Sequence, residues 1–156
     1  MQRKVQIMNA RKRKKWQKQH GTYINPKECW DLYRTMAEFI LPRLKQFKKD
    51  TMGYPGFGEM DTEEKWDIAL DKMIQAFEYI IAGDDWWLYN PKYDYTNGLY
   101  VEFEPLEDGS SNKVSMKEED WVAEIRENHE KEEMRRNQVI EEGLQLFAKW
   151  YMHLWW

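Results

Sequence analysis

Hydrophobic residues recur at helical spacing in three parts of the chain, and these parts define the predicted fold. The first follows Asn25-Pro26, where Asn25 can cap a helix, Pro26 suits its first turn and Glu28 can complete the cap. The pattern predicts a helix over 26–49, with a kink rather than a break at Pro42. Its apolar stripe, which we expect to be buried, consists of Trp30, Tyr33, Ala37, Ile40, Leu41, Leu44 and Phe47.

A second amphipathic segment predicts a helix over 62–82, which begins at the capping sequence of residues 61–64 and ends before Gly83. The preceding residues 50–60 contain three Gly and one Pro, and they predict a turn. A phosphate-binding loop is disfavoured because no Gly-Lys-Ser/Thr follows. The buried stripe of this helix consists of Trp66, Leu70, Met73, Ile74, Phe77, Ile80 and Ile81.

The third and longest helix is predicted over 116–155, with Ser115 to Glu118 as its capping sequence. Its first half is mostly charged, whereas its second half has an apolar stripe from Ile140 to Leu154. Gly143 lowers helix propensity inside this stripe, so we expect a neighbouring helix to approach closely there. The last aromatic residues would either pack on the helices or form a dimer contact.

Residues 84–115 interrupt the helical pattern and are rich in Tyr, Asn, Gly, Pro and Ser. Leu99, Val101 and Phe103 alternate with polar residues, which predicts a short strand that pairs with 113–116. The predicted fold is therefore mainly α. It is a three-helix bundle with a small irregular or β-hairpin insert over 84–115, preceded by a basic arm over 1–20. Residues 21–156 form a single domain, as the length of the chain favours.

Charge is distributed very unevenly along the chain. Residues 1–20 carry eight Lys/Arg and no Asp/Glu, so the net charge of −4 leaves −12 on residues 21–156. A basic arm attracts phosphates by counterion release, and an aromatic side chain within it can stack on a base. The alternative is a solubilising arm, or one that folds back on the acidic body. The candidate nucleic-acid-binding residues are Arg11, Lys12, Arg13, Lys14, Lys15, Trp16 and Lys18.

The aromatic residues of the insert have two interpretations. They either cover the helical core or, if exposed, provide a binding surface for a partner. Combined with an arginine, they would also suit a pocket for a nucleotide signal, although the acidic body opposes the capture of anions. The candidate partner- or ligand-binding residues are Trp86, Trp87, Tyr89, Tyr93 and Tyr95, together with Arg43 and Arg126.

Catalytic motifs are scarce, so we expect a protein that is not an enzyme and holds no metal or cofactor. The pair His129-Glu130 matches half of a zinc-protease motif, but position 133 is Glu instead of the second His. The alternative is a metal-dependent hydrolase that uses Asp67, Asp71, Glu78, His129 and Glu130. Arg43 offers Asp71 and Glu78 a simpler role in a salt bridge. No apolar run reaches the roughly 20 residues that span a bilayer, so no membrane association is expected.

Four blocks of the sequence resemble a family of small uncharacterised proteins of tailed bacteriophages. The blocks, which occur in this order along the chain, are WDL…AEFILPRLKQFK (30–48), GYP (53–55), W…LDKMIQAFE (66–78) and EGLQLFAKWY…LW (142–155). The basic arm and residues 84–138 depart from the family pattern. The resemblance implies a phage gene product that acts in the cytoplasm of the infected bacterium, and it supplies no functional residues.

Together these observations predict an accessory protein that acts by binding a host bacterial protein, in host takeover or counter-defence such as the inhibition of a bacterial immune system. The alternatives are a nucleic-acid binder that uses the basic arm and a sponge that sequesters a nucleotide immune signal. Whether the protein is a homo-oligomer stays open.

Overall fold

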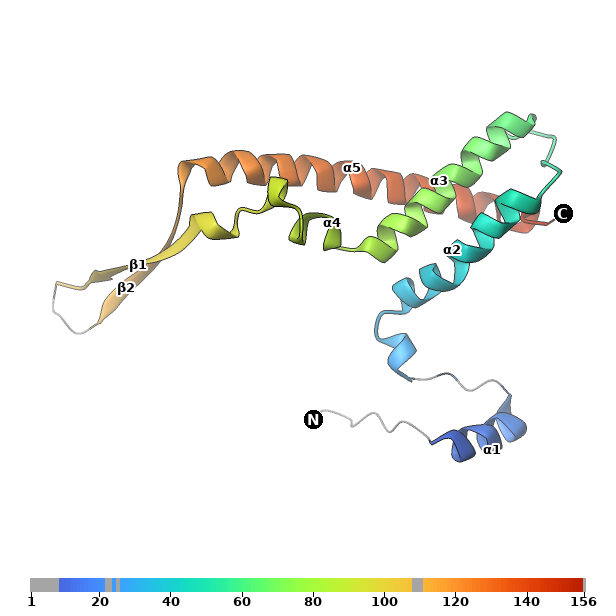
Figure 1. The fold of residues 1–156 in the computed structure, drawn as a ribbon, viewed down its shortest axis with the longest axis horizontal. Helices are drawn as coiled ribbons and strands as arrows, with labels where there is room; N and C mark the ends of the chain where they lie inside the picture. The colour runs from blue at the N-terminus through green and yellow to red at the C-terminus, as the bar shows by residue number, and fades with distance from the viewer. Residues whose placement is uncertain (1–8, 22–23, 25, 108–110, 156) are drawn as a thin grey trace.

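The computed structural model describes residues 9–21, 24, 26–107 and 111–155. It is mainly helical, at 69%, with one small two-stranded antiparallel sheet. The longest described helices are α2 (Leu32–Asp50), α3 (Glu63–Ala82) and α5 (Asp120–Trp150) (Figure 1). The described residues also form α1 (Ala10–His20) and the short α4 (Asp85–Leu88), so the helix count exceeds the predicted three.

Helix α2 begins later than the sequence pattern predicts. Pro26–Cys29 form a separate 3₁₀ turn, and α2 starts only at Leu32, after Asp31, whose side chain makes no capping hydrogen bond. The predicted cap, Asn25, lies outside the described residues. The helix then continues through Pro42 to Asp50. Ala37 and Leu44 are its buried residues, and both belong to the predicted stripe.

Helix α3 forms the centre of the core and matches its predicted range. The Thr62 hydroxyl accepts a hydrogen bond from the Lys65 amide at 3.3 Å, and Gly83 ends the helix with a φ of +52°. Such a φ favours glycine. Helix α3 packs against α2 on one side and α5 on the other. The core residues that α3 contributes are Trp66, Ala69, Leu70, Met73 and Phe77.

Helix α5 starts at Asp120, so the predicted start at residue 116 is wrong. Residues 115–118, predicted as a helix cap, belong instead to strand β2 (Asn112–Glu118). Pairing with β1 (Leu99–Pro105) provides partners for the backbone groups that face this strand, and this tertiary context overrides the local capping pattern. At its other end α5 passes into a 3₁₀ turn, Tyr151–His153.

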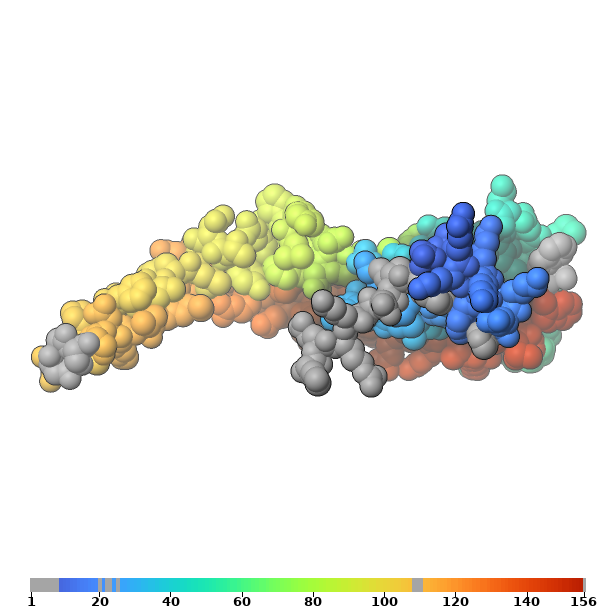
Figure 2. Space-filling model, turned by 90° about the horizontal axis from the view of Figure 1, so that it is seen from below, coloured from blue at the N-terminus to red at the C-terminus, as the bar shows by residue number. Residues whose placement is uncertain are grey.

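The predicted hairpin is confirmed and is longer than expected. Strands β1 and β2 pair in register from Leu99↔Glu118 to Pro105↔Asn112, and Figure 2 shows them extending beyond the helical body. On one face of the hairpin, Nζ of Lys117 lies 3.5 Å from Oε2 of Glu102. On the other face, apolar side chains such as Phe103 are exposed. Residues 108–110 of the predicted turn lie outside the described residues.

The segment between α3 and the hairpin is built from short turns. After α4 it forms 3₁₀ turns at Pro91–Tyr93 and Thr96–Gly98, and the first of these packs on α5. Gly98 packs so closely on α5 that an added Cβ would lie 2.3 Å from Cγ2 of Val122. None of the described helices is long and apolar enough to cross a membrane.

Candidate functional site

Helix α2 carries apolar side chains on two faces, and only one of them is covered. Ala37 and Leu44 pack into the core, whereas Met36 and Phe39 point away from it, and Phe39 is 59% exposed. Trp30, which precedes the helix, is 89% exposed. The predicted burial of Trp30 and Tyr33 is therefore wrong. The hollow beside Trp30 is lined only by residues 26–38, and Tyr33 is 65% exposed although it lines a small hollow with residues of α3 and α5.

This uncovered face forms one wall of a groove of about 720 Å³. The second wall comes from the end of the chain, where Phe147, Tyr151 and Leu154 follow one another at helical spacing. A groove of this volume and apolar character is typical of a binding site. Its apolar lining residues are Ile24, Cys29, Leu32, Met36, Phe39, Ile40, Leu44, Phe147, Tyr151 and Leu154.

Arg43, predicted to serve the aromatic insert, lies in this groove instead. Its guanidinium carbon is 3.5 Å from the centre of the Phe39 ring, and Nη1 donates a hydrogen bond to the Phe39 carbonyl oxygen at 2.5 Å. Arg43 and Glu28 are the charged residues of the lining. The groove therefore has an apolar floor with a positive charge held over an aromatic ring.

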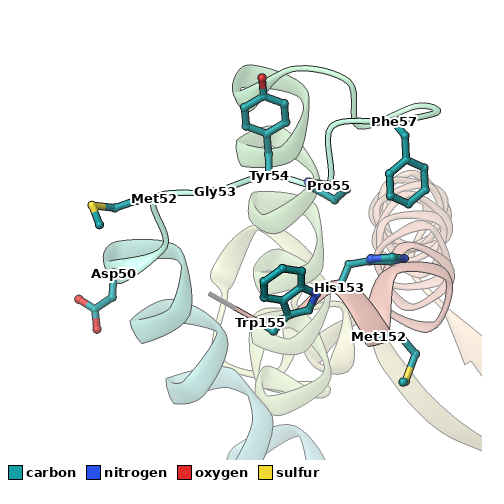
Figure 3. A pocket seen from close by; sticks show the side chains of 9 residues that line it. All are labelled: Asp50, Met52, Gly53, Tyr54, Pro55, Phe57, Met152, His153 and Trp155. Carbon is teal, nitrogen blue, oxygen red and sulfur yellow. The ribbon is translucent and has the colours of Figure 1, made fainter.

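A second hollow of about 590 Å³ lies between the turn that follows α2 and the C-terminal segment, residues 151–155 (Figure 3). The turn at residues 51–60 forms it, together with Met152, His153 and Trp155. Gly56 has a φ of +76°, and Phe57 holds the turn in place because its ring lies 5.6 Å from that of Trp150. Residues 151–155 therefore stand between two apolar hollows, which extends the uncovered surface beyond the groove.

The aromatic residues of the insert gather around a histidine of α5. His129, predicted as a metal ligand of the alternative hydrolase, is only 9% exposed. The centre of its ring lies 5.2 Å from the ring centre of Trp86 and 4.7 Å from that of Trp87. The ring centres of Tyr93 and Tyr95 lie 6.4 Å and 6.0 Å away and complete the cluster. Within the described residues, its buried Nε2 has no hydrogen-bond partner.

The two remaining insert candidates lie at the edge of this cluster. Tyr89 is 82% exposed, so it stands outside the packed rings. Arg126 binds the Glu118 carboxylate through a hydrogen bond, and its guanidinium carbon lies 5.9 Å from the Tyr95 ring. Arg126 thus joins the insert, the hairpin and α5.

A small hollow beside the aromatic cluster is the nearest arrangement to the predicted nucleotide pocket. Arg136, which the sequence reasoning did not single out, lines it and lies 3.8 Å from the Tyr79 ring and 5.1 Å from the Trp86 ring. The hollow encloses only about 190 Å³. Pockets that enclose a ligand generally have a volume of at least about 300 Å³, so this hollow is too small to enclose a whole nucleotide.

The basic candidates from Arg11 to Lys18 lie together on α1. Asn9 caps this helix by accepting a hydrogen bond from the Lys12 amide at 3.0 Å, and Gly21 ends it with a φ of +88°. All six cations of α1 are exposed, and among the described residues none of them forms an ion pair with a carboxylate. Helix α1 therefore keeps its positive charge available.

The predicted salt bridges of α3 exist, but with different partners. Lys48 binds Asp71 at 2.5 Å and Asp67 at 3.1 Å, and Lys45 binds Glu78 at 2.6 Å. The predicted partner, Arg43, lies two residues before Lys45, so it is on the opposite side of α2 and faces the groove. Among the described residues, no group of three or more His, Cys, Asp or Glu side chains is placed to hold a metal ion.

The groove was missed from the sequence, although a signal for it exists. Leu32, Met36 and Phe39 recur at i, i+4 and i+7, and they form a second apolar stripe beside the one that was predicted to be buried. A helix of 19 residues with two apolar stripes needs cover on both sides. The described part of the chain supplies that cover on one side only.

Comparison with known proteins adds no assignment. No protein-family model matches the chain, and no curated protein or solved structure is detectably similar to it.

Proposed function

We propose that this protein acts by binding rather than by catalysis, and that the groove between α2 and the C-terminal segment is where it binds a partner protein. The observation that carries the proposal is the uncovered apolar face of α2, which includes Met36 and Phe39. Contiguous exposed apolar surfaces on proteins generally mark interaction sites. The cost of leaving this face in water is offset when a partner covers it.

The nature of the partner follows from the resemblance to tailed-bacteriophage proteins. It supports a host bacterial protein in the cytoplasm of an infected cell. Binding there would serve host takeover or counter-defence, such as the inhibition of a bacterial immune system. An apolar groove suits this role because occupying a partner's exposed apolar segment can block that partner's own contacts.

The test compares two variants with the same chemical change at different places. Met36→Glu puts a charge into the groove, and Met134→Glu puts it on the exposed charged half of α5. Tagged full-length proteins are expressed in bacteria, cross-linked and purified, and captured proteins are quantified by mass spectrometry. We expect a protein that is enriched by the wild type and Met134→Glu, and reduced at least tenfold with Met36→Glu.

Circular dichroism confirms that both variants fold. The proposal is overturned if no protein is enriched above a tag-only control, or if a folded Met36→Glu captures the same proteins as the wild type.

A second candidate function, nucleic-acid binding, is favoured by one observation. The six cations of α1 are exposed and unpaired with any described carboxylate. If α1 binds phosphates, affinity for DNA or RNA falls steeply with salt, and deletion of residues 1–20 abolishes it. Met36→Glu leaves such binding unchanged, which separates the two functions. Binding that survives the deletion excludes α1 as its cause.

A further inference from the structure

The N-terminal part of the chain, which contains α1 and α2, differs in the sign of its charge from the rest of the chain. Residues 1–50 contain fourteen Lys/Arg and four Asp/Glu, whereas residues 51–156 contain ten Lys/Arg and twenty-four Asp/Glu. The groove lies between α2, in the positive part, and residues 147–154, whose only charged residue is Lys149 if His153 is neutral. Glu28 is the one carboxylate among its lining residues. Arg43 balances Glu28 in the lining, and Lys45 and Lys48 are paired with carboxylates of α3, so an excess of positive charge at the groove has to come from α1.

The chain path keeps the C-terminal end of α1 close to the groove. Helix α1 ends at His20, and Ile24, four residues later, already lines the groove. Four residues span at most about 14 Å, so the end of α1 cannot lie farther than that from the groove entrance. Because these cations lack carboxylate partners among the described residues, they are available to a second molecule.

The walls of the groove indicate the shape of its occupant. Leu32, Met36, Phe39 and Arg43 follow one face of α2 for about three helical turns. The facing wall is formed by Phe147, near the end of α5, and by Tyr151 and Leu154, in and just after the 3₁₀ turn, and no described strand edge lies among the lining residues. A groove that lies between α2 and the end of α5, and that offers no strand edge for pairing, best receives the apolar face of a third helix.

We infer that the groove receives an amphipathic helix of the partner protein, and that this helix carries acidic side chains beside its apolar face. This inference rests on the proposed function and specifies the partner's chemistry. The apolar face fills the groove along Met36 and Phe39, and the acidic side chains meet the cations of α1 and Arg43. The same cations would repel a helix with basic flanks and weaken its binding.

Two synthetic helical peptides with identical apolar positions test the inference, one with Glu and one with Lys on its flanks. Fluorescence anisotropy with the full-length protein measures their affinities at about 50 and 300 mM salt. We expect the Glu peptide to bind at least tenfold tighter at low salt. Replacing Lys12, Lys14 and Lys15 with Gln should remove most of that difference, as should high salt.

A neutral groove variant, Met36→Gln, should weaken both peptides, whereas Met134→Gln should weaken neither. If Met36→Gln weakens the binding of both peptides but the wild type binds the Lys peptide as tightly as the Glu peptide, the inference of an acidic partner is wrong. The groove is then still the binding site. If neither peptide binds while Met36→Glu abolishes protein capture, the helical occupant is wrong and the proposed function stands.

Vesicles of phosphatidylcholine and phosphatidylglycerol form a third arm. A basic helix next to an apolar surface is also a pattern of membrane-surface binding. Vesicle binding that requires both α1 and Met36, with no preference between the peptides, overturns the inference. Lack of such binding, together with preference for the Glu peptide, supports it.

Discussion

Gly143 of α5 and Ala76 of α3 meet where the two helices cross without room for another carbon atom. A Cβ on Gly143 would lie 2.4 Å from the Cβ of Ala76 and 2.5 Å from the Lys72 carbonyl oxygen. The backbone of α3 cannot move aside as a flexible side chain would. Close approach of a neighbouring helix is what the glycine predicts from the sequence, and the structure confirms it.

Gly143→Ala should therefore destabilise the protein, although alanine is the better helix former by about 1 kcal/mol. We expect the clash with α3 to outweigh that gain and lower the free energy of unfolding by about 1–2 kcal/mol. Urea unfolding followed by tryptophan fluorescence measures it. Gln138→Ala, on the exposed side of α5, should change the same quantity by less than about 0.5 kcal/mol. A more stable Gly143→Ala would show that the helices can separate freely.

His129 should tolerate an apolar ring better than a small side chain. Its buried Nε2 has no partner among the described residues, and an unsatisfied buried polar atom costs about 1–3 kcal/mol. We expect His129→Phe to unfold at the same or a higher urea concentration than the wild type. His129→Ala should lose about 2–4 kcal/mol, because it opens a cavity among four aromatic rings. Equal losses in both variants would indicate a polar role for the imidazole.

Arg126→Ala should loosen the hairpin and leave the core intact. The guanidinium holds the Glu118 carboxylate at the end of β2, and two isolated strands are marginally stable by themselves. We expect amide hydrogens of β1 and β2 to exchange several-fold faster, with those of α3 unchanged. Lys131→Ala is the control, because it removes an exposed ion pair with Glu127 from the same helix. It should change the amide exchange rates of neither the hairpin nor α3.

Asp94 should titrate below its ordinary pKa of 3.8. A hydrogen bond from the Thr96 hydroxyl, at 2.5 Å, lowers the pKa of this carboxyl, and the Thr96 amide adds to the effect at 3.0 Å. A carboxyl group whose pKa is lowered by folding stabilises the folded state at pH values above its ordinary pKa. This stabilisation is lost as the pH falls through the pKa of the folded state. NMR titration should find the carboxyl pKa higher in Thr96→Val than in the wild type. An unchanged pKa would exclude the hydroxyl as the main cause.

The sequence predicts the parts of the fold that depend on local patterns. The range of α3 follows from Thr62 and Gly83, and the hairpin follows from the alternation around Val101. The start of α5 could not be predicted in the same way. Ser115 to Glu118 satisfy a capping pattern, but their backbone groups pair with β1, and a distant partner of this kind leaves no local signal.

The candidate site is predictable only in part. That Arg43 lies beside an apolar surface depends on which side of α2 meets α3, and both sides of the helix carry apolar residues. The sequence pattern around Trp30 looks like any buried stripe, and only the three-dimensional arrangement shows that Trp30 is left uncovered. The grouping of Trp86, Trp87, Tyr93 and Tyr95 around His129 likewise requires contacts across more than thirty residues of sequence.

The length of α5 has an electrostatic consequence for the two ends of the molecule. Trp121, beside the hairpin, and Phe147, in the groove, are 26 residues apart on this helix. At a rise of 1.5 Å per residue they are about 39 Å apart. The ionic atmosphere of the cell screens exposed charges beyond about 8 Å. The acidic residues of the hairpin therefore cannot repel an acidic helix in the groove, and the two ends can evolve opposite charge without interfering with each other.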